Sequence, residues 1–134
     1  MANSAVPGSA DIRSGVDFRF RRGNRLLDGH SFQNVFDAAD YKAGDAVFLF
    51  LARENQGSAH RLGLIVGKKK VRRAVDRALV KRLIRESFRL RPEQLAGLDV
   101  VVLVRGNLRQ PDGKTLRAQL DLLWDKLLAK RRQA

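Results

Sequence analysis

The side chains with the clearest chemical capacity are cations that recur at every fourth position. Arg77, Lys81, Arg85 and Arg89 follow this spacing, and Arg82 stands beside them. Because residues four apart lie on the same side of a helix, the spacing predicts a row of positive charge on a rigid element. Neutralising phosphates releases bound counterions, so such a row is suited to a nucleic-acid backbone. The alternative interpretation is a solvated helix face, but such faces usually mix both signs of charge.

A second group of cations stands directly before this row. Lys68, Lys69 and Lys70 are followed by Arg72 and Arg73, between a predicted strand and the start of a predicted helix. The free N–H groups at a helix N-terminus favour an anion, and five neighbouring cations strengthen that preference. The sequence therefore predicts an anion site at this junction.

The chain's composition fits one soluble, strongly basic domain. Its 134 residues include 44% hydrophobic and 31% charged residues, and the formal net charge is +13. Residues 61–91 alone hold 12 of the 27 Lys and Arg against two acids, which favours nucleic acid over an anionic membrane or an acidic protein. The absence of cysteine and of any long apolar run indicates a cytoplasmic protein. We expect a flexible tail over residues 1–17 and a single domain over residues 18–134.

The phenylalanines allow two interpretations. Phe32 and Phe36 share one side of a predicted helix, and Phe48 and Phe50 share one face of a predicted strand. They could form part of the hydrophobic core, which is the more common role of such residues. They could also form a platform on which unpaired bases stack, because stacking tolerates any base.

The sequence offers little for catalysis. The two histidines, His30 and His60, are isolated, and no pair of carboxylates has the spacing of an acid–base site. No metal-ligating motif is present either. If the chain takes part in an enzyme, we expect a partner to supply the chemistry.

The periodicity predicts an α+β fold. The expected elements, in chain order, are a helix over 32–39 capped by Ser31, strands over 41–42, 47–52 and 62–67, a helix over 73–90, a strand over 99–104, and a last helix that begins at Asp112 or Thr115. We expect strands 47–52 and 62–67 to pair antiparallel with each other. Helices should pack on one sheet, with a β-α-β unit joining strands 62–67 and 99–104.

Several separate segments together resemble the bacterial ribonuclease P protein subunit. The likeness is carried by Arg61-Leu62-Gly63-Leu64, Gly67-Lys68-Lys69, Lys81-Arg82-x-x-Arg85-Glu86-x-Phe88-Arg89, Ser31-Phe32-x-x-Val35-Phe36 and Asp99-Val100-Val101-Val102. Order, spacing and residue type agree over roughly residues 18–130.

The resemblance implies both a fold and a function. The fold would be a two-layer α-β sandwich of order α-β-β-β-α-β-α with a left-handed β-α-β crossover. The protein would assist a catalytic RNA that hydrolyses precursor tRNA to give the mature 5′ end. Mg²⁺, bound mainly by that RNA, would take part in the chemistry. The expected partners are ribonuclease P RNA and precursor tRNA, with no membrane and no obligate protein partner.

The resemblance also assigns roles to residues. The 5′ leader of precursor tRNA would lie between the first helix and the sheet, in contact with Phe32, Phe36, Phe48, Phe50, Arg61 and Lys68. The catalytic RNA would contact Lys69, Lys70, Arg72, Arg73, Arg77, Lys81, Arg82, Arg85 and Arg89. No residue of this chain would be catalytic.

The chain departs from the family pattern within its central helix. Where the family has Arg-Asn-Arg-x-Lys-Arg, this chain has Ala78 and Leu79 in place of the Asn and second Arg. Losing one charge-assisted contact to phosphate costs about 1.5–3 kcal/mol, which would weaken RNA binding by roughly 10- to 100-fold.

Two other functions remain open from the sequence. A non-enzymatic RNA-binding module of ribosomal type could have the same fold. An amphipathic helix on an anionic membrane is less favoured, because the apolar side of the helix is needed for the core.

Overall fold

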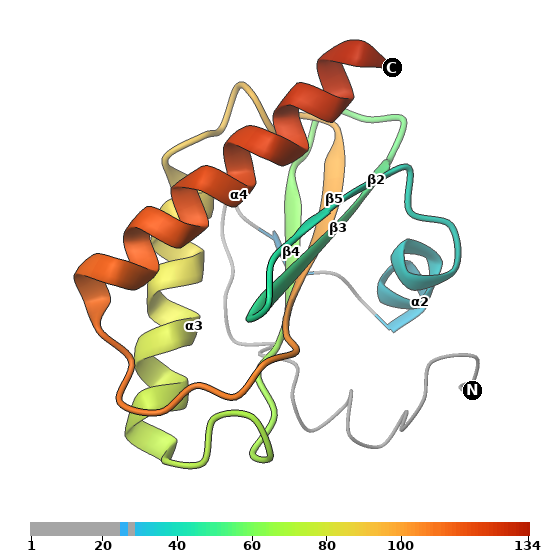
Figure 1. Ribbon diagram of the computed structural model, residues 1–134. Helices are drawn as coiled ribbons and strands as arrows, with labels where there is room; N and C mark the ends of the chain where they lie inside the picture. The colour runs from blue at the N-terminus through green and yellow to red at the C-terminus, as the bar shows by residue number, and fades with distance from the viewer. Residues whose placement is uncertain (1–24, 27–28) are drawn as a thin grey trace.

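A computed structural model of the chain describes residues 25–26 and 29–134 (Figure 1). The predicted tail, residues 1–17, lies outside the described residues. Five strands and three helices are described, and their bounds in chain order are β1 Arg25–Leu26, α2 Gly29–Asp37, β2 Tyr41–Gly44, β3 Phe48–Glu54, β4 Arg61–Ile65, α3 Ala74–Arg89, β5 Leu98–Val104 and α4 Gly113–Gln133.

The strands form one mixed sheet with the order β1-β4-β5-β3-β2. β4 and β5 are parallel neighbours joined through α3, which confirms the predicted β-α-β unit. The predicted pairing of 47–52 with 62–67 is wrong, because β5 lies between β3 and β4 and runs antiparallel to β3. β1 was not predicted, since two residues are too short to show a strand pattern. The hand of the crossover stays a prediction from the resemblance.

The helices lie on both faces of the sheet (Figure 1). α3 and α4 cover one face and enclose the main core with the inward residues of β3, β4 and β5. α2 packs on the opposite face, against β3 and β5. β5, in the middle of the sheet, is apolar at six of its seven positions because both of its faces are covered. The α+β class is confirmed, with α2 on the far face from the other two helices.

α3 matches its predicted span to within one residue at each end. Its buried positions include Val80, Leu83, Ile84 and Phe88, which lie on the apolar side predicted from the sequence. Ser87 joins α3 to α4, since its Oγ accepts a hydrogen bond of 2.8 Å from the indole nitrogen of Trp124. This buried bond satisfies both polar groups and fixes how the two helices pack.

The starts of the other two helices test two predicted caps. Asp112 caps α4, and its carboxylate accepts a hydrogen bond of 3.0 Å from the backbone N–H of Thr115. The predicted cap at Ser31 is wrong, because α2 begins at Gly29 and Ser31 lies inside the helix.

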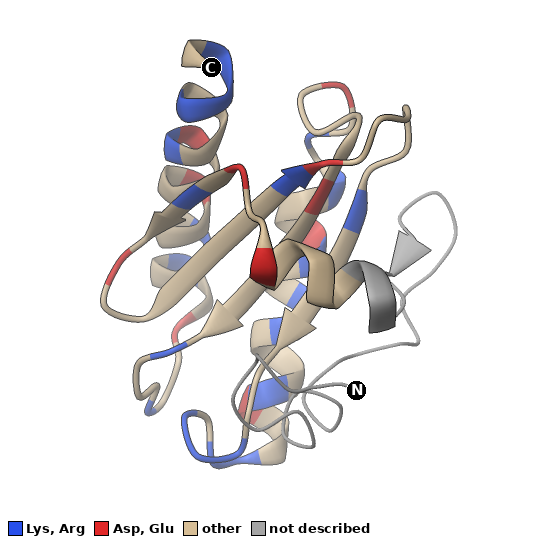
Figure 2. Cartoon of the chain, turned by 90° about the vertical axis from the view of Figure 1, so that its right-hand side faces the viewer, with Lys and Arg blue, Asp and Glu red and all other residues tan. Residues whose placement is uncertain are grey.

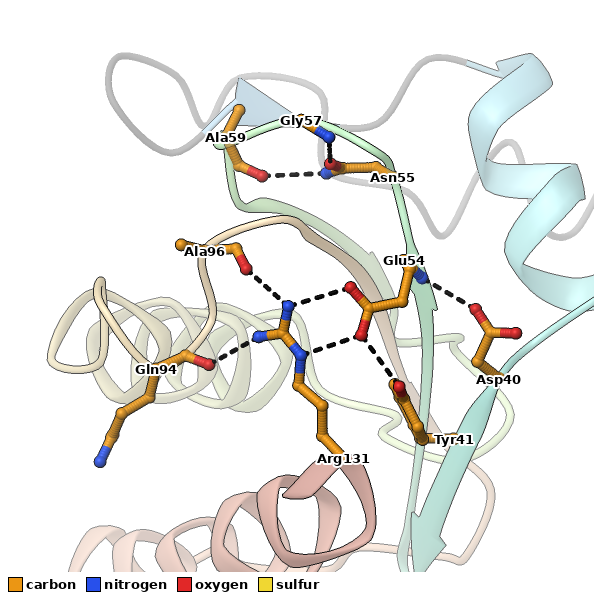
Figure 3. Close-up of polar contacts among 9 residues, drawn as sticks. All are labelled: Asp40, Tyr41, Glu54, Asn55, Gly57, Ala59, Gln94, Ala96 and Arg131. Carbon is orange, nitrogen blue, oxygen red and sulfur yellow. Dashed lines mark hydrogen bonds and ion pairs between the residues drawn. The ribbon is translucent and has the colours of Figure 1, made fainter. Parts of the chain in front are cut away.

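A polar network ties the end of α4 to the far end of β3 (Figure 3). The guanidinium of Arg131 donates two hydrogen bonds of 2.9 Å to the carboxylate of Glu54. It also donates to the backbone oxygens of Gln94 and Ala96, at 2.9 and 2.8 Å. The hydroxyl of Tyr41 donates to Glu54 at 2.9 Å. The hydrogen bond from Arg131 is the main cause that lowers the pKa of Glu54, while burial raises the pKa of Tyr41.

We expect Glu54→Gln to lower the melting temperature at pH 7 by about 2–5 °C, because a partly exposed ion pair contributes about 1 kcal/mol or less. A carboxylate with a lowered folded-state pKa stabilises the fold above its unfolded pKa and loses that effect as pH falls through the folded value. The variant should therefore lose less stability than the parent when the pH falls from about 5 to about 3, a range that spans the ordinary pKa of glutamate. Thermal melts across this range check both points. Glu93→Gln, an exposed glutamate, is the control, and equal acid sensitivity in all three proteins would contradict the assignment.

Candidate nucleic-acid interface

The cations of α3 differ in how freely they face solvent. Arg82 and Arg89 are exposed, whereas Lys81 and Arg85 are partly buried and each has a further interaction within the molecule. Arg82, Arg85 and Arg89 lie on the helix away from its buried apolar side, whereas Lys81 lies at the edge of that side, three residues before Ile84. The periodicity thus correctly predicted the helix and the outward position of Arg82 and Arg89. The role of these cations in RNA binding stays a prediction.

Arg77, the first cation of the row, is engaged in the structure. Its Nη1 donates hydrogen bonds to the backbone oxygens of Val71 and Arg72, at 2.9 and 2.8 Å. The side chain therefore holds the preceding loop against the first turn of α3. A substitution at Arg77 would disturb this loop as well as remove a charge.

The two residues that depart from the family pattern have different surroundings. Ala78 is exposed, and Leu79 is partly buried against the main core. Leu79 therefore packs as the sequence predicted. A long cation at position 79 would give up part of that apolar contact.

The loop between β4 and α3 presents most of its cations to solvent. Lys68, Lys69, Arg72 and Arg73 are exposed, and Lys70 is partly buried. The loop turns after Gly67, whose backbone oxygen accepts hydrogen bonds from the N–H groups of Lys70 and Val71 at 3.2 and 3.0 Å. Figure 2 shows these Lys and Arg positions at one end of the molecule, continuing into α3. The two groups of cations predicted from the sequence therefore follow one another in space, first in the loop and then along α3.

Phe48 and Phe50 do not lie where the leader prediction requires them. Both are 0% exposed and point into the main core beneath α3 and α4. The ring of Phe50 packs edge-on against Trp124, with 4.6 Å between ring centroids. A buried ring cannot stack on a base, so we correct the prediction for these two residues: they are core residues.

The other face of β3 carries the side chains that the sequence analysis missed. Leu49 is partly buried there, close to α2, and Leu51 is buried beside it. Ile65 of β4 is also partly buried on this face, and Leu103 of β5 pairs in register with Leu49. Because side chains alternate along a strand, assigning β3 to the wrong face exchanges Phe48 and Phe50 for Leu49 and Leu51.

The two phenylalanines of α2 do lie against this face. Phe32 is 4% exposed and packs with Val35, Leu51 and Val101, so it anchors the helix to the sheet. Phe36 is partly buried, and its ring stacks on Phe32 with 5.6 Å between centroids. Of the four phenylalanines predicted to contact the leader, Phe36 is the one with an accessible ring.

Arg61 has a fixed intramolecular partner. Its guanidinium donates two hydrogen bonds of 2.7 Å to the carboxylate of Asp99 on the neighbouring strand. Asp99 is 5% exposed and also accepts a hydrogen bond of 2.9 Å from Asn55. The pair therefore neutralises a buried carboxylate, and a leader contact by Arg61 would have to use its remaining N–H groups.

The described residues show neither a metal centre nor a membrane-spanning element. No three Asp, Glu or His side chains among residues 25–26 and 29–134 converge as metal ligands. Mg²⁺ is often held by one or two carboxylates together with water and phosphate oxygens, so this finding concerns only a site built from protein side chains alone. None of the described helices combines the length and the apolarity that crossing a bilayer requires.

Comparison with known proteins gives a consistent result. Residues 20–128 match the family model described as Ribonuclease P. The chain is 48% identical over 115 residues to a ribonuclease P protein component from Alcanivorax borkumensis, covering 86% of this chain and 95% of the relative. It is 46% identical over 112 residues to the corresponding component from Pseudomonas aeruginosa, covering 84% and 83%.

Solved structures agree with the fold. The ribonuclease P protein from Thermotoga maritima superimposes with a TM-score of 0.61 and 30% identity, over 75% of this chain and 96% of that chain. The corresponding protein from Staphylococcus aureus gives a TM-score of 0.69 over 78% and 95% of the two chains, at 23% identity. The second similarity supports the fold alone.

Proposed function

Because this chain belongs to the ribonuclease P protein family, we propose that it is the protein subunit of ribonuclease P. In this proposal it binds the catalytic RNA through α3 and the loop before it, and it holds the 5′ leader of precursor tRNA on the α2 face of the sheet. The RNA carries out the hydrolysis that releases the leader. This role is consistent with the lack of an acid–base pair in the sequence.

The observation that carries the proposal is the concentration of exposed cations in the loop before α3 and along α3. Exposed Lys68, Lys69, Arg72 and Arg73 lead into α3, where Arg82 and the other outward cations follow. So many positive charges close together attract a polyanion such as RNA and accelerate its encounter with the protein. The helix is held by its packing on the core, so the backbone that carries these charges needs no ordering when it binds.

The leader contacts in this proposal come from the α2 face. Phe36 supplies an accessible ring, and the partly buried Leu49 and Ile65 supply an apolar floor beside it. Partly buried Arg53 and exposed Lys42 lie on neighbouring strands of the same sheet. A single strand needs a stacking group together with cations for its backbone, and this face offers both. Lys68, exposed just beyond β4, remains a proposed leader contact.

Magnesium enters this proposal through the RNA. Mg²⁺ bound there would activate the attacking water and stabilise the leaving oxygen. The protein's contribution would be to reduce repulsion between phosphates, which favours both substrate and metal binding. Among the described residues, no group of three Asp, Glu or His side chains converges to hold a metal ion.

We expect Phe36→Ala to weaken binding of precursor tRNA to the reconstituted enzyme by about 10-fold and to leave mature tRNA binding unchanged. Loss of one base-stacking contact costs about 1–3 kcal/mol, and only molecules with a leader can make it. Equilibrium binding of the two RNAs, measured in parallel, gives the comparison.

The matched control is Leu122→Ala, which removes an apolar side chain 56% exposed on α4. It should bind both RNAs as the parent does. Equal losses for precursor and mature tRNA in Phe36→Ala would reject the leader assignment. If the parent protein itself binds RNA but does not distinguish precursor tRNA from mature tRNA, the result would favour a ribosomal-type RNA-binding module.

A further inference from the structure

A pocket of about 330 Å³ lies between the loop before α3 and the loop before α4. Five cations line it: Lys69, Lys70, Arg72 and Arg73 from the first loop and Arg109 from the second. The amide side chains of Asn107 and Gln110 belong to the same lining. Figures 1 and 2 both show the two loops side by side at one end of the molecule. The second loop carries no role in the family resemblance stated above.

The two walls of this pocket are connected through the backbone. The N–H of Leu108 in the second loop donates a hydrogen bond of 2.9 Å to the oxygen of Lys70 in the first. The second loop begins after Val104, the last residue of β5, and the N–H of Gly106 donates to the oxygen of Val47 at 3.1 Å. A side chain at Gly106 would collide with the backbone oxygen of Ala46, so only glycine allows this close approach. These contacts give the pocket a defined shape before any ligand arrives.

The charge in the pocket is strongly unbalanced. Against five cations there is one carboxylate, Asp76, in the first turn of α3. Its distance to the Nε of Arg73 is 3.9 Å, at the long end of an ion pair, and the Arg73 side chain is 70% exposed. The pocket therefore retains several positive charges that a bound anion would neutralise, and the start of α3 adds the positive end of its dipole.

We propose that this pocket binds one nucleotide unit of the partner RNA: a backbone phosphate against the cations, and its nucleoside against the amides. This inference rests on the proposed function and adds Asn107, Arg109 and Gln110 to the RNA-binding surface. The volume lies near the lower end of small-ligand sites, so it holds more than a single phosphate ion. Asn107, Gln110 and Asp76 provide the donors and acceptors that base edges and 2′-hydroxyls require.

The test compares two double substitutions that remove the same kinds of groups. Asn107→Ala with Arg109→Gln alters exposed residues of the pocket, and Gln133→Ala with Arg132→Gln alters exposed residues at the far end of α4. Affinity for a bacterial ribonuclease P RNA is measured over a range of salt concentrations. The pocket variant should bind about 5- to 10-fold more weakly, with a salt slope lower by about one, because one phosphate contact is lost. The control should change less than about twofold, as isolated exposed charges far from RNA contribute little.

A second measurement uses a 5′-phosphorylated trinucleotide as the probe. Its addition to the full-length protein should shift the amide resonances of Leu108 and Arg109, and these shifts should disappear in the pocket variant. If parent and pocket variant bind the ribonuclease P RNA equally while the parent binds it tightly, the pocket inference is overturned and the proposed function stands. If the parent itself does not bind that RNA, both fall. Shifts caused by a glutamate-rich peptide but not by the trinucleotide would assign the pocket to an acidic protein and overturn the inference.

Discussion

Replacing Arg82 and Arg89 together with glutamine should weaken binding to ribonuclease P RNA by about 100-fold at 0.1 M salt, because each charge-assisted phosphate contact contributes about 1.5 kcal/mol or more. Both side chains are exposed on α3, so their replacement removes charge from the surface and leaves the packing of the core unchanged. The slope of log affinity against log salt should fall by about two, one for each phosphate no longer neutralised. Filter binding across a salt series measures both quantities.

Arg82 and Arg89 give a cleaner test than the start of the row. Arg77 holds the loop before α3 through Val71 and Arg72, so its loss would combine a structural effect with a charge effect. Arg117→Gln with Arg132→Gln removes two exposed arginines of α4 and controls for net charge. If this control pair lowers the affinity and the slope as much as the α3 pair, the RNA contacts are not localised on α3 and the assignment is wrong.

Phe50→Ala should lower the free energy of unfolding by about 3–5 kcal/mol, a large fraction of the total for a domain of this size. The ring is 0% exposed and packs against Trp124, so its removal leaves a cavity between β3 and α4. The folded fraction of the variant should bind precursor and mature tRNA with the same ratio as the parent does. Chemical denaturation and paired binding measurements give the two results.

Leu49→Ala on the same strand is the matched comparison for Phe50→Ala. Leu49 is partly buried on the α2 face, so its truncation should cost about 1–2 kcal/mol, less than full burial would imply. It should also reduce the preference for precursor over mature tRNA. A Phe50→Ala protein that keeps its full stability and loses only precursor binding would restore the leader contact first predicted for that residue.

The contrast between α3 and β3 shows why the helices were predictable and the sheet face was not. In α3 one side is apolar and another carries most of the cations, so Val80 and Leu83 on the first and Arg82 on the second are assigned by periodicity alone. In β3 the run from Phe48 to Ala52 is apolar at every position, because α4 covers one face and α2 the other. Alternation then carries no information about which residues face the core.

Strand pairing and the second loop were beyond prediction for a related reason. β3 and β4 are adjacent in sequence, and the shortest connection suggested a hairpin. The parallel pairing of β4 with β5, through Leu64 and Val102 among others, depends on how α3 packs and leaves no local pattern. The pocket that includes Arg109 likewise joins two loops that are about 40 residues apart in sequence, and only the fold brings them together. Its cations could be counted from the sequence, but their convergence could not.

The measurement that tests the central claim most directly is cleavage of a precursor tRNA by a bacterial ribonuclease P RNA at limiting Mg²⁺, with and without this protein. The account predicts strong stimulation, release of the mature 5′ end, and little stimulation by the protein carrying Arg82→Gln and Arg89→Gln. Cleavage that is unchanged by the parent protein, under conditions where another bacterial ribonuclease P protein stimulates it, would contradict the account. A repeat with Ala78→Asn and Leu79→Arg would then show whether those two positions account for the failure.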